Sequence, residues 1–461
     1  MNIQYYPVLA LGTICIAQGA AVGQVAFDAV ELDQPTESSP QWLGVSASMF
    51  GNRAYFGAPG NSSAGTNAGA VYRYELSDSI NAPTLVIDKQ VDADDRFAAS
   101  LAARNYSFGD GNLTDIVIGA PGDEGPDGAQ GAIYLFEIFG DLHGRIYDPD
   151  GQPGDDFGTS VAFTQGQVAV GAPGSLGTDN EPRGSVAVFD PDTDGFPSLY
   201  DLGRDENTMD FSFGGSLDMQ GVYIIVGAPG YPEDLDPPNL LATRGAAYVY
   251  FRSTGTLFAR LRAPVRTNNA RFGSSVSVND GQFLIGAPGD SVAVSNGGAA
   301  YFQSGNSQMV RITPPDLDPG DEFGFSVDHG DDFLLVGAPG DDDAGEDAGA
   351  VYVYRRDSLL FINKILPSPP FDMPGTRFGS SVAQDTFSDS FITGAPVANT
   401  GQGAAFDLEN NCRADFDENG LLNFFDVNGF LFFQTDWNGD GLFNFFDVSG
   451  FLFDFTTGCR E

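Results

Sequence analysis

The sequence has few of the side chains on which most enzyme chemistry depends. Its 461 residues include two histidines and three cysteines, and 21 lysines and arginines stand against 63 aspartates and glutamates. His143 and His329 lie in no recognisable nucleophile or metal motif, so a Ser-His-Asp triad or a histidine-rich metal centre is hard to assemble. We therefore expect a protein that is not an enzyme.

Positive charge is equally scarce. The formal net charge of −42 disfavours binding to nucleic acid and to anionic membrane surfaces. Cations or basic partners are the ligands that this charge favours, although an acidic surface also serves solubility alone.

Long apolar runs are absent except at the start of the chain. Residues 7–22 are apolar and uncharged and end in small residues, which predicts that residues 1–23 are a secretory signal peptide, with a buried first strand as the alternative. No other run is long enough to span a bilayer, so we expect no transmembrane segment after signal removal. The protein is predicted to be secreted, either free or at the cell surface.

Only two cysteines remain once Cys15 leaves with the signal peptide. Cys412 and Cys459 bracket the C-terminal segment, and an oxidising compartment favours a disulfide between them. Two unpaired thiols are the alternative if the protein is not exported.

The tripeptide Gly-Ala-Pro recurs seven times. Its copies begin at residues 57, 119, 171, 227, 286, 337 and 394, so they lie 51 to 62 residues apart. A period in this range is typical of repeat folds whose unit cannot bury its own apolar face. In the third copy, residues 157–163, 167–174 and 184–190 read as three short strands. With a fourth strand such as 358–366 in the sixth copy, the pattern predicts an all-β fold, a seven-bladed β-propeller.

The last repeat lacks a fourth strand, because it runs directly from 403–412 into the C-terminal segment. Residues 24–33 precede the first repeat and alternate like a strand. We predict that they supply the missing edge strand and close the ring, so that the propeller spans residues 24–410.

The dipeptide Phe-Gly, followed by Gly-Ala-Pro, resembles the FG-GAP repeat of integrin α chains and their bacterial relatives. The first copy departs from it with Trp-Leu-Gly at 42–44, and the second reads Arg-Phe-Ala at 96–98. The resemblance implies a ligand-binding face built from the loops before Phe-Gly and after Gly-Ala-Pro. A ring of carboxylates there could bind cations or a basic partner, although a solvated loop surface is the alternative for any one residue. The acidic residues of these loops are Asp94, Asp95, Asp123, Glu124, Asp155, Asp156, Asp321, Glu322, Asp341, Asp342, Asp343, Glu346 and Asp347.

Integrin-type blades often carry a calcium loop between their first two strands. Only the second copy comes close to this pattern, with Asp110, Gly111 and Asp115. A plain turn rich in Asp and Gly is the alternative.

The strongest predicted site is a tandem pair of calcium loops after Cys412. Alternate residues of a tight loop provide the oxygen ligands that Ca²⁺ requires, and a glycine at position six makes the turn. The predicted ligands are Asp415, Asp417, Asn419, Leu421 (through its carbonyl), Asn423 and Asp426 in the first loop, and Asp436, Asn438, Asp440, Leu442, Asn444 and Asp447 in the second.

The two loops resemble dockerin, a calcium-dependent docking module, because position twelve is Asp and no helix precedes either loop. The resemblance implies a small α-helical domain at 411–461 that binds a protein or cell-surface component. Phe424, Phe425, Phe445 and Phe446 occupy the positions that contact the partner in dockerins, where small hydroxyl residues are usual. We expect them to dock a partner, with packing on the flank of the propeller as the alternative.

These features together predict a secreted or cell-surface calcium-binding protein. Its propeller is expected to bind an unknown protein or glycan, and its tail to attach it to a surface. The alternative is an extracellular hydrolase that acts on polysaccharide or phosphoester and is anchored by the same tail. A pocket on the propeller axis with converging carboxylates and a perturbed pKa would favour that alternative.

Overall fold

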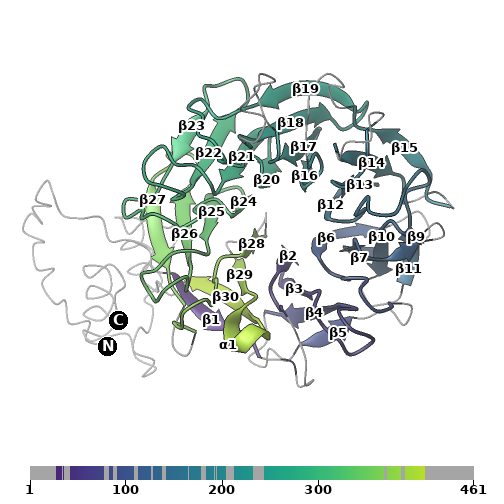
Figure 1. Ribbon diagram of the computed structural model, residues 1–461, viewed down its shortest axis with the longest axis horizontal. Coiled ribbons are helices and arrows are strands. Elements are labelled where there is room, and N and C mark those ends of the chain that lie inside the picture. Colours follow the sequence, from purple (N-terminus) through teal and green to yellow (C-terminus); the bar gives the residue numbers. More distant parts are fainter. Residues whose placement is uncertain are drawn as a thin grey trace, which may run out of the picture. The chain divides into compact units, whose positions relative to one another are not determined.

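The computed structural model describes residues 27–33, 35, 42–76, 83–86, 91–107, 113–125, 128–137, 142–164, 166–177, 183–191, 193, 195–203, 212–231, 243–367, 371–385 and 390–410. Within these residues the strands form seven four-stranded sheets and one short two-stranded hairpin. Figure 1 shows the seven sheets as blades around a central axis, with β2, β6, β12, β16, β20, β24 and β28 innermost. The predicted seven-bladed β-propeller is therefore confirmed.

Six blades are continuous in sequence. From the axis outward, their strands are β2 (Ser46–Phe50), β3 (Arg53–Ala58), β4 (Ala70–Glu75) and β5 (Thr84–Val86); β6 (Ser100–Ser107), β7 (Leu113–Ala120), β10 (Ala132–Glu137) and β11 (Leu142–Ile146); β12 (Ser160–Thr164), β13 (Gln167–Ala172), β14 (Ser185–Phe189) and β15 (Ser198–Asp201); β16 (Ser216–Gln220), β17 (Tyr223–Ala228), β18 (Ala246–Phe251) and β19 (Thr256–Leu261); β20 (Ser275–Asn279), β21 (Gln282–Ala287), β22 (Ala299–Ser304) and β23 (Val310–Ile312); and β24 (Ser326–His329), β25 (Phe333–Ala338), β26 (Ala350–Arg355) and β27 (Phe361–Ile365). The hairpin β8 (Glu124–Gly125) and β9 (Gly128–Ala129) lies between β7 and β10 in the sequence.

The seventh blade is assembled from both ends of the described chain. Its inner strands are β28 (Ser381–Gln384), β29 (Phe391–Ala395) and β30 (Ala404–Asn410), with the single-turn helix α1 (Ala398–Gly401) between the last two. Strand β1 (Phe27–Glu31) adds on the outside of β30, and the Leu32 amide donates to the Ala405 carbonyl at 2.9 Å. The strand expected from residues 24–33 therefore closes the ring, as predicted, and no inner strand of the blade is left with an open edge.

One serine begins the innermost strand of every blade and ties it to the next blade. Within the described residues, its hydroxyl donates to the carbonyl of the residue after Phe in the following Phe-Gly motif, at 2.7 to 3.0 Å. The last of these hydrogen bonds runs from Ser381 back to Gly44 in the first blade. The donors and acceptors are Ser46 to Ala98, Ser100 to Gly158, Ser160 to Gly214, Ser216 to Gly273, Ser275 to Gly324, Ser326 to Gly379 and Ser381 to Gly44.

The same contact explains the glycine of Gly-Ala-Pro. A Cβ atom built on Gly337 would lie 2.0 Å from the carbonyl oxygen of Gly379 in the next blade, and each of the other six copies shows an overlap at 2.0 to 2.2 Å. The acceptor residue itself has a φ of +72° to +92° in every blade, which favours glycine; only Ala98 differs. One close approach between neighbouring blades therefore accounts for both glycines of the repeat: it excludes a side chain at the first and favours glycine at the second.

Aromatic side chains fill the space behind this contact. The Phe of the motif packs edge-on against an aromatic residue on the third strand of its own blade, as in Phe323 against Tyr352 at 5.3 Å between ring centroids. Leu43 takes the place of Phe in the first blade and is fully buried. The two copies that depart from the pattern thus keep its geometry: Leu43 fills the Phe site, and Ala98 adopts the positive φ of the glycine.

We predict that Gly337→Ala destabilises the propeller by about 3 kcal/mol, the upper range for inserting a methyl group into a packed interior. The Cβ atom would overlap a backbone oxygen that is itself fixed by a hydrogen bond from Ser326, so it cannot be relieved by a side-chain rotation. Urea denaturation measures the change. Gly203→Ala is the matched control, because a Cβ atom there meets nothing within 4 Å. Equal midpoints for the two variants would contradict this account of the repeat.

Candidate functional site

The loop that leads into the innermost strand of each blade carries one residue just before Phe or Leu of the motif, and we call these seven residues the mouth. This residue has a positive φ of 52° to 64° in all seven blades although none of the seven is glycine. Its carbonyl accepts a hydrogen bond from the amide three residues later, as from Phe325 to Glu322 at 3.0 Å. In each blade, therefore, this residue lies in a tight turn and its side chain points away from the packed Phe or Leu that follows it. The seven residues are Trp42, Arg96, Asp156, Ser212, Arg271, Glu322 and Arg377.

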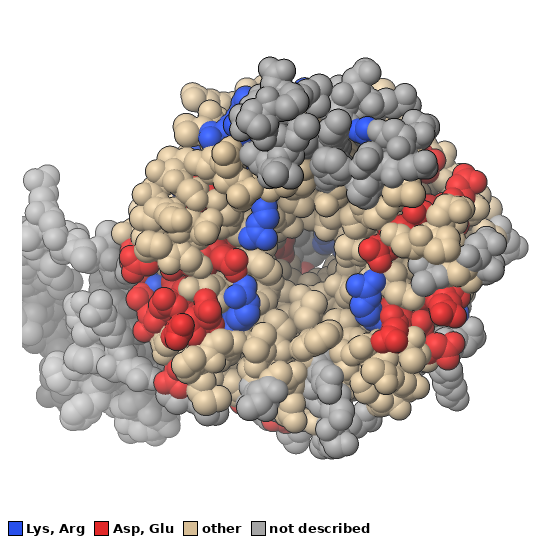
Figure 2. All heavy atoms as spheres, viewed as in Figure 1, with Lys and Arg blue, Asp and Glu red and all other residues tan. Residues whose placement is uncertain are grey.

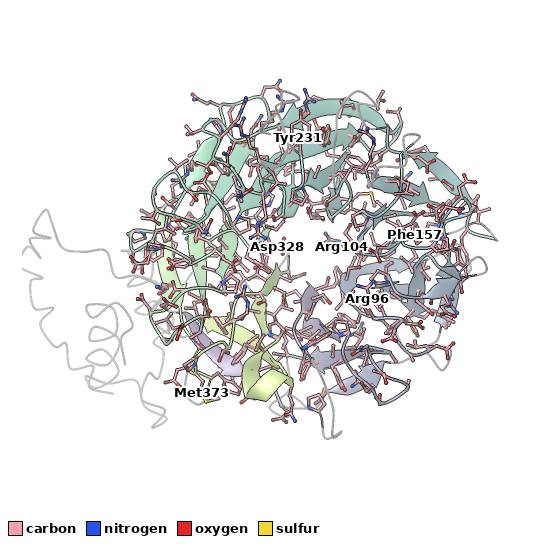
Figure 3. The ribbon with its side chains drawn as sticks, viewed as in Figure 1. Arg96, Arg104, Phe157, Tyr231, Asp328 and Met373 are labelled. Atoms are coloured by element: carbon pink, nitrogen blue, oxygen red, sulfur yellow. The ribbon has the colours of Figure 1, made fainter. Side chains whose placement is uncertain are left out.

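These side chains pair across blade boundaries. Arg96 contacts Asp156 at 3.0 Å, and Glu322 is contacted by Arg377 at 2.6 Å and by Arg271 at 3.7 Å. Figure 2 shows blue side chains around the hollow at the centre of this face, and Arg96 is labelled beside the axis in Figure 3. With three arginines and two acids, the mouth carries one net positive charge in a chain of net charge −42.

A cavity of about 160 Å³ lies on the axis and is lined by the innermost strands of all seven blades. Its charged residues are Arg104 on β6, Asp218 on β16 and Asp328 on β24. In Figure 3, Arg104 and Asp328 lie on facing sides of the axial opening. The other polar groups of its lining include Ser48, Ser277, Gln220, His329 and Gln384.

The two carboxylates are held by the blade that follows each of them. Asp218 accepts the Val278 amide at 2.7 Å, and Asp328 accepts the Gln384 amide at 2.9 Å. Ser277 donates its hydroxyl to Asp328 at 3.0 Å. Burial raises the pKa of Asp328 to about 6, and the charge of Asp218 adds to the rise. Burial likewise raises the pKa of Asp218, against the opposing effect of its backbone hydrogen bonds and of Arg104.

The site brings together Ser277, His329 and Asp328, but their hydrogen bonds are not those of a nucleophilic triad. His329 Nδ1 lies 3.0 Å from the Ser277 hydroxyl, but Asp328 also contacts that hydroxyl and not the imidazole. A triad needs the acid on the far nitrogen of the histidine. Burial lowers the pKa of His329 to about 3, so the imidazole is neutral over the physiological range. His143 lies on the outermost strand of the second blade, 3.7 Å from Glu137, so the two histidines are not brought together.

Part of the predicted acidic face is buried and neutralised. Asp123, Asp290 and Asp341 follow Gly-Ala-Pro-Gly, and each accepts the hydroxyl of a tyrosine eleven residues later, at 2.5 to 2.7 Å. A cation on the fourth strand completes each group: Arg145 for Asp123, Arg311 for Asp290 and Lys364 for Asp341. The expectation that Asp123 and Asp341 face a ligand is therefore wrong, because burying an unpaired carboxylate is too costly and the blade supplies a partner.

Three further acids expected on that face close turns instead. Asp95, Asp155 and Asp321 are nearly inaccessible, and each accepts a backbone amide three residues earlier, at 2.7 to 2.8 Å. Burial raises the pKa of Asp95 to about 6 and that of Asp321 to about 7. The acids that remain solvent-exposed are Asp94, Glu124, Asp342, Asp343, Glu346 and Asp347, while Asp156 and Glu322 are half-buried in the mouth.

The remaining site predictions fall outside the described residues. They are the disulfide Cys412–Cys459, both calcium loops, the four docking phenylalanines, and Asp110 with Gly111 of the calcium-loop candidate in the second blade. Asp115 lies within β7, which forms part of the second blade. In the part of the chain that the structure describes, no group of three or more His, Cys, Asp or Glu side chains is placed to hold a metal ion. No helix among those residues is long and apolar enough to cross a membrane.

The FG-GAP repeat family matches three segments of the chain, residues 142–189, 256–302 and 307–354. Each segment begins at or close to the outermost strand of one blade and ends in or just after the third strand of the next. The chain carries FG-GAP repeats. The other four copies show the same Gly-Ala-Pro contact between blades in the structure. No curated protein matches the chain.

Sequence reasoning missed the axial residues Arg104, Asp218 and Asp328. A signal for them exists, because the serine that begins each inner strand sets a common register. Two residues after it, the chain reads Ser48, Ala102, Ala162, Asp218, Ser277, Asp328 and Ala383. The two aspartates stand out only after the seven strands are aligned.

We predict that Asp321→Asn removes part of the pH dependence of stability. Because the folded-state pKa of Asp321 lies near 7, above its unfolded value of 3.8, its contribution is fully present at pH values below about 4 and is lost as the pH rises to 7. The urea midpoint of the variant should therefore fall less steeply than that of the parent between pH 4 and 7. Asp357→Asn, at an exposed turn, controls for the loss of one negative charge. Parallel pH profiles for parent and Asp321→Asn would contradict the assignment.

Proposed function

We propose that the propeller is a ligand-binding or adhesion platform whose ligand contacts the mouth of the axis. FG-GAP propellers suit such a role, and the observation that supports this location is the repeated positive-φ turn. Left-handed backbone is uncommon for residues other than glycine and tends to occur where function requires it. Here seven turns present side chains of different chemistry on one surface, including three arginines and, in the first blade, the exposed Trp42.

The chemistry of the mouth differs from that of the whole chain. The net charge of −42 favours basic ligands, whereas the mouth offers guanidinium groups that bind carboxylates and planar surfaces. The acidic residues beyond the mouth would repel an anionic ligand from other parts of the face (Figure 2). A protein or glycan that presents acidic groups to the axis therefore fits this surface best.

We predict that reversing charge at the mouth weakens ligand binding. A glycan and protein array probed with the protein identifies the ligand, and Arg271→Glu together with Arg377→Glu should reduce its binding by about tenfold or more, because these groups flank Glu322 and lose their attraction for the ligand's acids. Arg260→Glu, on the outermost strand of the fourth blade, is the matched control. If the parent, the double variant and Arg260→Glu bind the ligand equally, the ligand contacts another surface of the protein.

We further propose that the protein is secreted and that residues 411–461 attach it in a calcium-dependent way. The support is the tandem loop pattern in the sequence, together with the FG-GAP propeller, which is typical of extracellular proteins. A module of this size has little core of its own, so ion binding should provide much of its stability.

We predict that calcium and attachment are linked in this segment. Calorimetry on residues 412–461 should find two calcium sites, and Asp415→Ala with Asp436→Ala should abolish both. A partner retained by the full-length protein in calcium should be released by chelator and lost in Phe425→Ser with Phe446→Ser. Retention that neither chelator nor the two substitutions reduce would show that these residues do not dock the protein.

A hydrolase remains the second candidate, and the axial cavity is the observation that favours it. Asp218 and Asp328 converge there with raised pKa values, as a catalytic acid and base would. Both carboxylates, however, accept backbone amides of the next blade, so they already hold the ring together. Hydrolysis of a polysaccharide or phosphoester that Asp328→Asn abolishes, without loss of folding, would favour the enzyme.

A further inference from the structure

The guanidinium group of Arg104 has no partner in the described structure. It forms no hydrogen bond and no salt bridge there, although its charge acts on both Asp218 and Asp328. Arg104 is half-buried in the cavity wall, where a ligand of opposite charge would replace the hydration that the guanidinium has lost. Figure 3 shows Arg104 extending from β6 toward the axis, with Asp328 on the facing side. Because Arg104 forms no salt bridge with Asp218 or Asp328, its guanidinium lies farther from these carboxylates than in a direct ion pair.

The facing carboxylates have unused acceptor capacity. Asp218 accepts the Val278 amide and the amide of Met219, and Asp328 accepts Ser277, His329 and Gln384. An ionised carboxylate offers about four lone-pair sites, so each retains at least one. The mutual repulsion of Asp218 and Asp328 is only partly offset by Arg104, so a second cation between them would be stabilised.

One residue of the cavity lining carries a buried polar atom without a partner. His329 is 2% exposed and lines the cavity, and its Nε2 atom forms no hydrogen bond. Unsatisfied buried polar atoms are rare in native structures, and each calls for an explanation such as strain or a bound water molecule. This atom is independent of the acidic pair, because it belongs to an imidazole that Asp328 does not contact.

The volume limits what the cavity can hold. An apolar cavity of about 150 Å³ accommodates benzene, a molecule of six heavy atoms. The axial cavity has a similar size, about 160 Å³, but its two sides carry opposite charge. A ligand that satisfies both sides must be small and must carry a cation at one end and an anion at the other.

We propose that the axial cavity binds a small zwitterion, with its carboxylate on Arg104 and its ammonium group between Asp218 and Asp328. Guanidinium groups bind carboxylates through paired N–H donors, and an ammonium group offers three donors to the two acids. A divalent cation fits less well, because Arg104 would repel it and fewer than three acidic or imidazole ligands converge among the described residues. This site is lined by residues other than those of the mouth and does not depend on the ligand proposed there.

Isothermal titration calorimetry on the full-length protein tests the proposal. The probes are glycine, β-alanine and γ-aminobutyrate, which space their two charges by increasing lengths. Propionate and ethylamine each carry one of the two charges. At least one zwitterion should bind about tenfold or more tightly than either single-charge probe, because only a zwitterion satisfies both walls of the cavity. Binding of propionate or ethylamine at the same strength, or no binding by any probe, would overturn the proposal.

Substitutions test which residues bind the carboxylate and which bind the ammonium group of the ligand. Arg104→Met and Asp328→Asn should each weaken binding by about tenfold or more, and Arg104→Lys should retain part of it, because a lysine keeps the charge but not the paired donors. Arg260→Met, on the outermost strand of the fourth blade, is the control and should bind as the parent does. Thermal melting separates loss of the site from loss of the fold: each variant should still unfold cooperatively, well above the temperature of the binding measurement. Binding that survives Arg104→Met in full would overturn the assignment.

Discussion

The fold depends on one repeated contact, in which a serine hydroxyl and a bare glycine of one blade meet the same backbone carbonyl of the next. The hydrogen bond is 2.7 to 3.0 Å long in every blade, and the glycine leaves no room for a side chain. Because a blade buries its apolar faces only against its neighbours, seven such contacts must be made together. The contact between Ser381 and Gly44 closes the ring, and β1 completes the blade in which it occurs.

Many of the acidic residues in the sequence are buried in the propeller and help to hold it together. Within the described residues, Asp123, Asp290 and Asp341 lie in buried groups with a tyrosine and a cation, and Asp95, Asp155 and Asp321 accept backbone amides. These residues hold turns and blades together and take no part in the surface charge. The exposed acids lie on the loops that surround a mouth with three arginines, so the charge at the axis has the opposite sign to that of the chain.

Much of the fold could be predicted from the sequence, because the repeat is a local pattern. Gly-Ala-Pro, the alternating strands and the orphan strand at 24–33 gave the number of blades and the means of closure. The fate of the loop acids could not be predicted in the same way. Asp341 follows the second strand of its blade and Lys364 lies on the fourth. Whether they meet depends on how the folded blade places these strands, which no local sequence pattern gives. The axial site was hidden for a related reason, since Arg104, Asp218 and Asp328 come from three blades and meet only after ring closure.

The position of β30 within its blade has a mechanical consequence. This strand ends at Asn410, where the C-terminal segment begins, and it lies between β29 and β1 and not at the edge of the sheet. A pulling force applied through that segment therefore acts on a strand that is hydrogen-bonded along both sides. To extract β30, the force must break its backbone hydrogen bonds to β29 on one side and to β1 on the other. A load applied at the end of β30 would therefore also be resisted by β1, the strand that closes the ring.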